Sequence, residues 1–279
     1  GTLANSNDLA SYLLVGAPFC MFAFEHAGKV MKAFWLVSLL VLVNLVLKTG
    51  SRAGLLTLVL VIVYLFFKAS PIMKIAMGTM AIAGVMAAPF VLPQSVLERY
   101  ALTFSTSSAG ELTTRQAEYA AGSTESRTKM LQISLLTTIR NPIFGVGPGM
   151  FAVATAEEAK EQGERAAWLQ THNMYTQVSS ETGIPGFILY ISAVVIGFRN
   201  IGYAKTRAGL NTQLVSMASW LRVSYLAFLF TGLFASTAFH LNIILLLACS
   251  QALRNAAELE TQVAQAPRVP ALRPARVIR

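Results

Sequence analysis

The chain has 279 residues, of which 54% are hydrophobic and 13% charged, and its mean hydropathy is +0.56. Soluble domains carry about a quarter charged residues, so this composition excludes an ordinary soluble domain and indicates a membrane protein with several spans. The net charge of +9 does not point to a nucleic-acid partner, because the basic residues concentrate in short loops and the tail. Cys20 and Cys249 both lie in apolar runs, which argues against a disulfide framework or a zinc site.

Seven apolar stretches predict an all-α fold, a polytopic bundle of transmembrane helices. They span residues 9–24, 33–47, 53–67, 75–92, 174–198, 214–234 and 241–253. Accordingly, residues 1–92 should form four spans, 93–171 a long and partly helical loop, 172–253 three further spans, and 254–279 a disordered tail rich in proline and arginine.

The distribution of charge predicts the orientation in the membrane. Lysine and arginine are frequent in the loops 25–32, 68–74 and 199–213 and in the tail, and short basic loops face the cytoplasm. The start of the chain, the turn at 48–52, the long loop and the turn at 235–240 then face the other compartment. In a Gram-negative cell that compartment is the periplasm.

Two arginines on this side are candidates for binding an anion. Ser51 is a plausible N-cap, which places Arg52 in the first turn of a helix. Free amides, the positive helix end and a guanidinium together suit phosphate; the alternative is an interfacial arginine that contacts lipid phosphate. Ser123 or Thr124 is predicted to cap a second helix with Arg127 in its first turn, and the alternative there is the solvated face of a loop helix.

A glycine-rich segment follows this second helix, which should end before Pro142. The spacing of Gly145, Gly147 and Gly149 invites a nucleotide-binding interpretation. However, no strand precedes it and Pro148 lacks an amide donor, so a tight turn against the membrane face is favoured.

His172, one of three histidines in the chain, lies where the long loop meets the fifth apolar stretch. We expect Thr171 to cap a short helix that starts at His172 and ends near Gly183, with Pro185 opening the next span. An imidazole at this rim can accept a proton near neutral pH; the alternative is an interfacial histidine bonded to a backbone carbonyl. No second His or Cys stands at ligand spacing and His240 is isolated in the sequence, so no metal site is expected.

Taken together, these stretches resemble the bacterial O-antigen ligase family, within a superfamily that includes O-antigen polymerases and some protein O-oligosaccharyltransferases. The resemblance runs from residue 1 to about 253. Its motifs are Asn7-Asp8-Leu9-Ala10, Thr49-Gly50-Ser51-Arg52-Ala53-Gly54, the Arg127 helix leading into Asn141-Pro142-Ile143-Phe144-Gly145-Val146-Gly147, and His172-Asn173-Met174-Tyr175 leading to Glu181-Thr182-Gly183.

The resemblance implies a glycosyltransferase in the bacterial inner membrane, with its active site facing the periplasm. Its donor would be an undecaprenyl-diphosphate-linked glycan, and its acceptor a sugar hydroxyl, chiefly of lipid A core. The hydroxyl would displace the diphosphate with inversion, and no cofactor, metal or nucleotide would be needed. Arg52 and Arg127 match the arginines thought to hold the diphosphate, and His172 matches the proposed catalytic histidine.

Four further residues are expected to help bind substrate, namely Asn173, Tyr175, Arg140 and Asn7. Family members usually have more than seven spans, so we expect this chain to be the C-terminal part of such a protein.

Three other functions stay open from the sequence. A polymerase that joins repeat units on the lipid carrier would use similar parts, as would a ligase that glycosylates protein. A transporter is the non-enzymatic alternative. Against transport, no inverted repeat is visible, and no charged residue is expected deep in a span, with Arg222 placed in about the first turn of its helix.

Overall fold

The computed structural model describes residues 5–104, 114–161, 163, 168–209 and 211–265, and within 101–124 it describes the backbone alone. Helix is the only regular structure in these ranges, so the predicted all-α fold is confirmed. The helices are α1 (Ser6–His26), α2 (Lys29–Lys48), α3 (Arg52–Lys68), α4 (Pro71–Val91), α5 (Gln94–Phe104), α6 (Thr114–Arg140), α7 (Phe151–Glu161), α8 (Met174–Arg207), α9 (Thr212–Thr231) and α10 (Leu241–Gln265).

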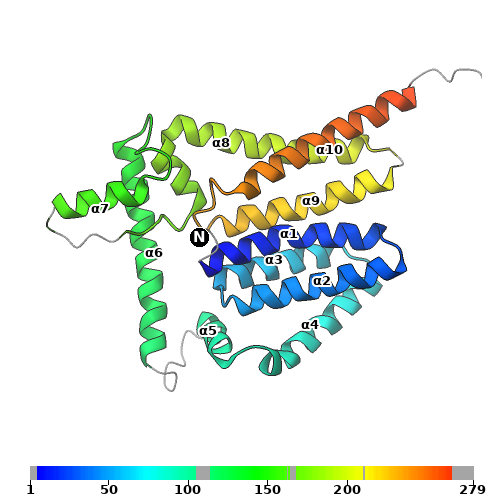
Figure 1. Cartoon of the computed structure of the whole chain (residues 1–279), viewed down its shortest axis with the longest axis horizontal. Coiled ribbons are helices and arrows are strands. Elements are labelled where there is room, and N and C mark those ends of the chain that lie inside the picture. Colours follow the sequence, from blue (N-terminus) through cyan, green and yellow to red (C-terminus); the bar gives the residue numbers. More distant parts are fainter. Residues whose placement is uncertain (1–4, 105–113, 162, 164–167, 210, 266–279) are drawn as a thin grey trace, which may run out of the picture.

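Five of these helices are long and apolar enough to cross a membrane, namely α1, α2, α4, α8 and α9. The sequence predicted seven spans, and the two that fall short are α3, with 17 residues, and α10, whose C-terminal half is polar. Both nevertheless lie alongside the long helices of the bundle (Figure 1).

The outer surface of the bundle is strongly apolar. On α4 no residue is buried, and Phe90, Val85 and Ile75 are between 73% and 91% exposed. The outward faces of α2 carry Phe34, Val37 and Val41 in the same way. Exposed apolar surface on this scale marks contact with lipid or with another membrane protein.

The interior of the bundle combines a large apolar core with buried hydrogen bonds between helices. Tyr225 and Phe228 of α9 are fully buried against α8 and α10. The Ser11 and Thr231 hydroxyls join α1 to α9 at 3.0 Å, and Ser224 Oγ donates to the Val15 carbonyl at 2.8 Å. Such contacts hold helices together where lipid offers no hydrogen bonds.

The predicted break in α8 is present at Gly183, whose φ of 71° lies in the left-handed region. A Cβ there would come within 2.4 Å of the Ile143 carbonyl oxygen, so the position requires glycine. The preceding carbonyls of Ser180 and Glu181 accept from the amides of Val146 and Gly147, each at 2.9 Å. The glycine-rich segment is therefore a tight turn, as predicted, and it packs against the kink.

Two expectations about helix ends are wrong. Ser123 and Thr124 do not cap a helix, because α6 already begins at Thr114, which makes Arg127 its fourteenth residue of 27. The segment 254–265, predicted to be disordered, continues α10 as far as Gln265; residues 266–279 lie outside the described ranges. In both cases the helix extends past the local signal that was taken for its end.

The depth of Arg222 also differs from expectation. It is the eleventh of the 20 residues of α9, about 15 Å from the start of the helix, and not within the first turn. A charged residue therefore does lie deep in a span, and this argument against a transporter does not hold.

The two ends of the bundle differ in what they carry. One end gathers the turn before α3, the start of α8 and the turn between α9 and α10, and α6 stands across this end (Figure 1). We call it the Arg52 end. The opposite end carries the connections between α1 and α2, α3 and α4, and α8 and α9.

Candidate functional site

Arg52 is the first residue of α3, and its helix is held firmly against α1. Ser51 caps α3 as predicted, because its Oγ accepts from the Gly54 amide at 3.0 Å. The same hydroxyl donates to Asn7 Oδ1 at 2.5 Å. A Cβ on Gly54 would lie 2.7 Å from Ala10 Cβ, so glycine permits the close approach of the two helices. Asn7, predicted to bind substrate, thus has a positioning role in the structure.

Arg127 lies midway along α6, where it is half-buried. Its pKa is lowered first by burial and then by the positive charge of Arg52. The structure therefore brings these two guanidiniums within electrostatic range of each other, although they are 75 residues apart in the sequence. Because Arg127 is far from the start of α6, the helix dipole supports anion binding at Arg52 but not at Arg127.

His172 is the third member of this cluster. Burial lowers the pKa of His172, and the positive charge of Arg127 lowers it further. This lowered pKa favours the neutral imidazole at pH 7, which is the form able to accept a proton. Its backbone φ is 53°, a left-handed conformation that is uncommon for a residue other than glycine and that neighbouring structure must hold in place.

The loop that carries His172 is tied to the turn between α9 and α10. The His172 amide donates to Ser236 Oγ at 2.9 Å, and the Thr171 hydroxyl lies 3.0 Å from the same oxygen. The Met174 amide donates to the Gly232 carbonyl at 2.7 Å. Ser236 therefore helps position His172, a role that nothing in the local sequence indicates.

Asn173 and Tyr175, predicted to bind substrate, are engaged within the protein. Asn173 Oδ1 accepts from the amides of Tyr175 and Thr176, so Asn173 and not Thr171 caps α8. Its Nδ2 donates to the Leu233 carbonyl at 3.1 Å. The Tyr175 hydroxyl donates to the Leu229 carbonyl at 3.0 Å. Both side chains fasten α8 to the end of α9.

Arg140 is separated from the cluster. It is the last residue of α6, about 20 Å along the helix from Arg127, and it forms an ion pair with Glu158 of α7. Its side chain is 60% exposed. The structure thus places Arg140 at a surface contact between α6 and α7 and not beside His172.

The contacts of further polar groups at the Arg52 end were not predicted from the sequence. His240 is not isolated, since its ring stacks on Tyr12 with centroids 5.7 Å apart and it interacts electrostatically with Asp8. Arg99 of α5 approaches the turn before α3, with Nη1 3.3 Å from where a Cβ on Gly50 would lie. These groups come together through tertiary packing alone.

Two guanidiniums and a neutral imidazole, all partly withdrawn from water, can bind a compact polyanion and accept a proton beside it. Within the described ranges, no group of three or more His, Cys, Asp or Glu side chains is placed to hold a metal ion.

Comparison with known proteins identifies the family. A search of curated proteins finds no match to the chain. The model of the O-antigen ligase family matches residues 36–191, more than half of the chain. The match runs from α2 into α8 and includes Arg52, Arg127 and His172. The chain therefore belongs to the O-antigen ligase family.

Proposed function

We propose that this protein is an O-antigen ligase that transfers a glycan from undecaprenyl diphosphate to a sugar hydroxyl of lipid A core at the periplasmic face of the inner membrane. Its family is one of membrane glycosyltransferases of the ligase and polymerase type. The observation that carries the proposal is the convergence of Arg52, Arg127 and His172, since this cluster matches a diphosphate leaving group and a hydroxyl nucleophile.

Arg52 and Arg127 would hold the diphosphate. As the bond between the anomeric carbon and the diphosphate oxygen breaks, its electron pair moves to that oxygen and negative charge accumulates there. Two guanidiniums stabilise this charge more in the transition state than in the bound donor, which accelerates the reaction. Bound diphosphate would also relieve the repulsion between the two arginines.

His172 would accept the proton of the acceptor hydroxyl as its oxygen attacks the anomeric carbon. This single displacement inverts the configuration and requires no covalent intermediate. The lowered pKa of His172 supports the role, because a general base must be unprotonated before the reaction. The role is as a base or as a group that orients the hydroxyl, and the pH dependence described in the Discussion separates the two.

The test uses a strain that lacks the ligase, complemented with the full-length protein. Arg52→Ala, Arg127→Ala and His172→Ala should each reduce the attachment of polysaccharide to lipid A core by about 100-fold or more. Lys129→Ala is the matched control, because it removes an exposed positive charge on the same helix as Arg127. Membrane levels of each variant are measured by immunoblot. Transfer at the wild-type rate by all three site variants would refute the assignment.

The product of the reaction decides between the proposed activity and its alternatives. Lipid A core that carries polysaccharide indicates a ligase, and longer chains that remain on the lipid carrier indicate a polymerase. Glycosylated protein indicates a protein ligase. Movement of the glycan across the membrane without a new glycosidic bond would indicate a transporter.

A further inference from the structure

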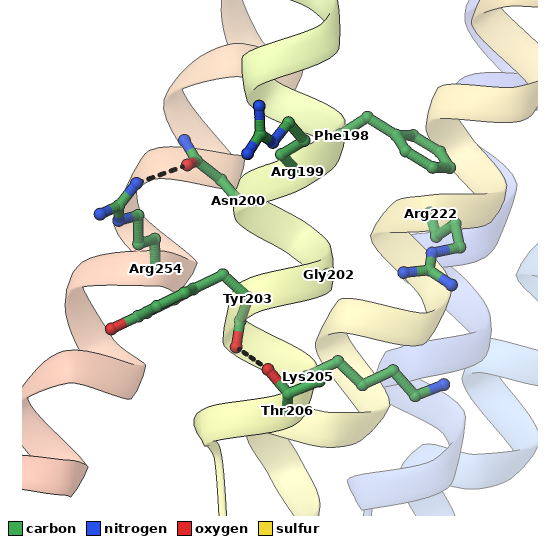
Figure 2. Close-up of a pocket in the computed structure, with 9 residues that line it drawn as sticks. All are labelled: Phe198, Arg199, Asn200, Gly202, Tyr203, Lys205, Thr206, Arg222 and Arg254. Atoms are coloured by element: carbon green, nitrogen blue, oxygen red, sulfur yellow. Dashed lines mark hydrogen bonds between the residues drawn. The ribbon is translucent and has the colours of Figure 1, made fainter.

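A basic pocket lies at the end of the bundle opposite the Arg52 end. It has a volume of 840 Å³ and is formed by residues of α8, α9 and α10. Four cationic side chains line it, namely Arg199, Lys205, Arg222 and Arg254 (Figure 2). None of them belongs to the cluster that carries the proposed transfer reaction.

Arg222 is the most unusual member of this pocket. It projects from the middle of a helix apolar enough to cross a membrane, where a charged residue is costly and marks a functional position. Its guanidinium lies over the Phe198 ring, 5.3 Å from the centroid. Its Nε is buried without a hydrogen-bond partner among the described residues. Arg222 as a whole is only partly buried, and a guanidinium in this state is stabilised when an anion accepts hydrogen bonds from it.

The backbone opposite Arg222 leaves room for its guanidinium. A Cβ on Gly202 of α8 would lie 3.7 Å from Arg222 Nη2, in ordinary contact, so a side chain longer than that of alanine would compete for the same space. Figure 2 shows Arg222 directed toward the lower part of α8, where Lys205 and Thr206 lie.

The other cations are only partly compensated. Arg254 Nε donates to Glu258 at 2.9 Å and its Nη1 to Asn200 at 3.2 Å. Lys205 Nζ donates to the Ser219 hydroxyl at 3.0 Å. Among the described residues, Glu258 is the one carboxylate in an ion pair with this set, which leaves a surplus of positive charge in the pocket.

We propose that this pocket binds the phosphate of an anionic phospholipid from the leaflet opposite the proposed transfer site. The basic loops at this end predict that it faces the cytoplasm, and basic pockets between transmembrane helices on that side bind anionic headgroups. A lipid suits it better than a soluble anion because the exposed apolar side chains of Val195 and Ile196 lie within one turn of Phe198 in the pocket lining and would contact its acyl chains. The proposal does not depend on the transfer reaction.

The experiment measures binding by the purified full-length protein in detergent. The probe is short-chain phosphatidylglycerol, compared with the zwitterionic phosphatidylcholine of the same chain length and with inorganic phosphate. We expect phosphatidylglycerol to bind saturably, and Arg222→Gln to weaken it about 5- to 10-fold, since each cation near an anionic headgroup contributes about 1 kcal/mol. Lys68→Gln should leave binding unchanged, because it removes an exposed cation at the same end but outside the pocket.

A second variant separates loss of the site from misfolding. Gly202→Leu keeps every charge and fills the space beside Arg222, so it too should weaken phosphatidylglycerol binding, while Arg222→Lys should retain most of it. Equal binding of both lipids, or unchanged binding in Arg222→Gln and Gly202→Leu, would overturn the proposal. Saturation by inorganic phosphate at the same affinity would overturn the assignment to a lipid and identify a soluble anion as the ligand.

Discussion

Replacement of Ser236 by alanine tests whether the turn between α9 and α10 positions the loop that carries His172. Ser236 is 7% exposed, and its hydroxyl accepts from the His172 amide at 2.9 Å. The substitution leaves the backbone in place and removes this acceptor. It also removes the contact at 3.0 Å with the Thr171 hydroxyl, which still donates to the Asn173 carbonyl.

The size of the effect follows from these contacts. An amide left without an acceptor in a partly buried loop costs about 1–3 kcal/mol. The left-handed backbone of His172 is itself strained by about 1 kcal/mol or more, so the loop gains by relaxing once its tether is gone. We therefore expect Ser236→Ala to lower the free energy of unfolding by about 1–3 kcal/mol. The rate of glycan transfer should fall by about 10-fold, because the imidazole moves away from Arg127.

The assay combines unfolding in mixed micelles with the initial rate of glycan transfer by the reconstituted full-length protein. Ser38→Ala is the matched control, since the Ser38 hydroxyl donates only to the Phe34 carbonyl of its own helix. If Ser236→Ala unfolds and transfers glycan like Ser38→Ala, then the turn between α9 and α10 does not hold His172.

Three other predictions concern the site and its supports. The rate of glycan transfer should be constant near pH 7 and fall as the pH drops below 6.5 through the lowered pKa of His172. Arg127→Gln should shift this fall to higher pH, because it removes a positive charge that lowers the His172 pKa. If the fall stays at the same pH, His172 is not the base. Gly145→Ala should be at least about 2 kcal/mol more destabilising than Gly149→Ala. Both glycines have positive φ, but of the two only Gly145 has no room for a Cβ, which would lie 2.4 Å from a backbone carbon. The free energies of unfolding of both variants measure the difference, and equal losses would contradict the prediction. Arg140→Gln should change the transfer rate less than 2-fold and stability by at most about 1 kcal/mol, since it breaks only an exposed ion pair; a 100-fold loss would return Arg140 to the binding site.

Local signals in the sequence predicted the helices well. An apolar run is visible in consecutive residues, so mean hydropathy located the centre of each apolar helix. The cap at Ser51 and the break at Gly183 each follow from the chemistry of a single residue. Where two caps competed, the prediction was wrong, because Asn173 bonds two amides while the Thr171 hydroxyl turns to Ser236.

The support of the site could not be predicted in the same way. Ser236 follows His172 by 64 residues and carries no motif, and Asn7 reaches Ser51 only because α1 crosses α3. Polar residues beside the proposed catalytic histidine can also serve the fold, as Asn173 and Tyr175 do, and the sequence does not distinguish that use from contact with substrate.

The hydrogen bond between Ser11 and Thr231 has a consequence for the order of biosynthesis. The two hydroxyls are 220 residues apart, and ribosomes add roughly 5–20 residues per second. Helix α1 therefore remains on the order of 10–40 s in the bilayer before Thr231 of α9 is made. During that interval α1 lacks its contacts with α9, so Arg52 reaches its final surroundings only late in synthesis. In a nascent chain halted before α9, Arg52 would therefore lie on a bundle in which α1 and α3 still lack their contacts with α9.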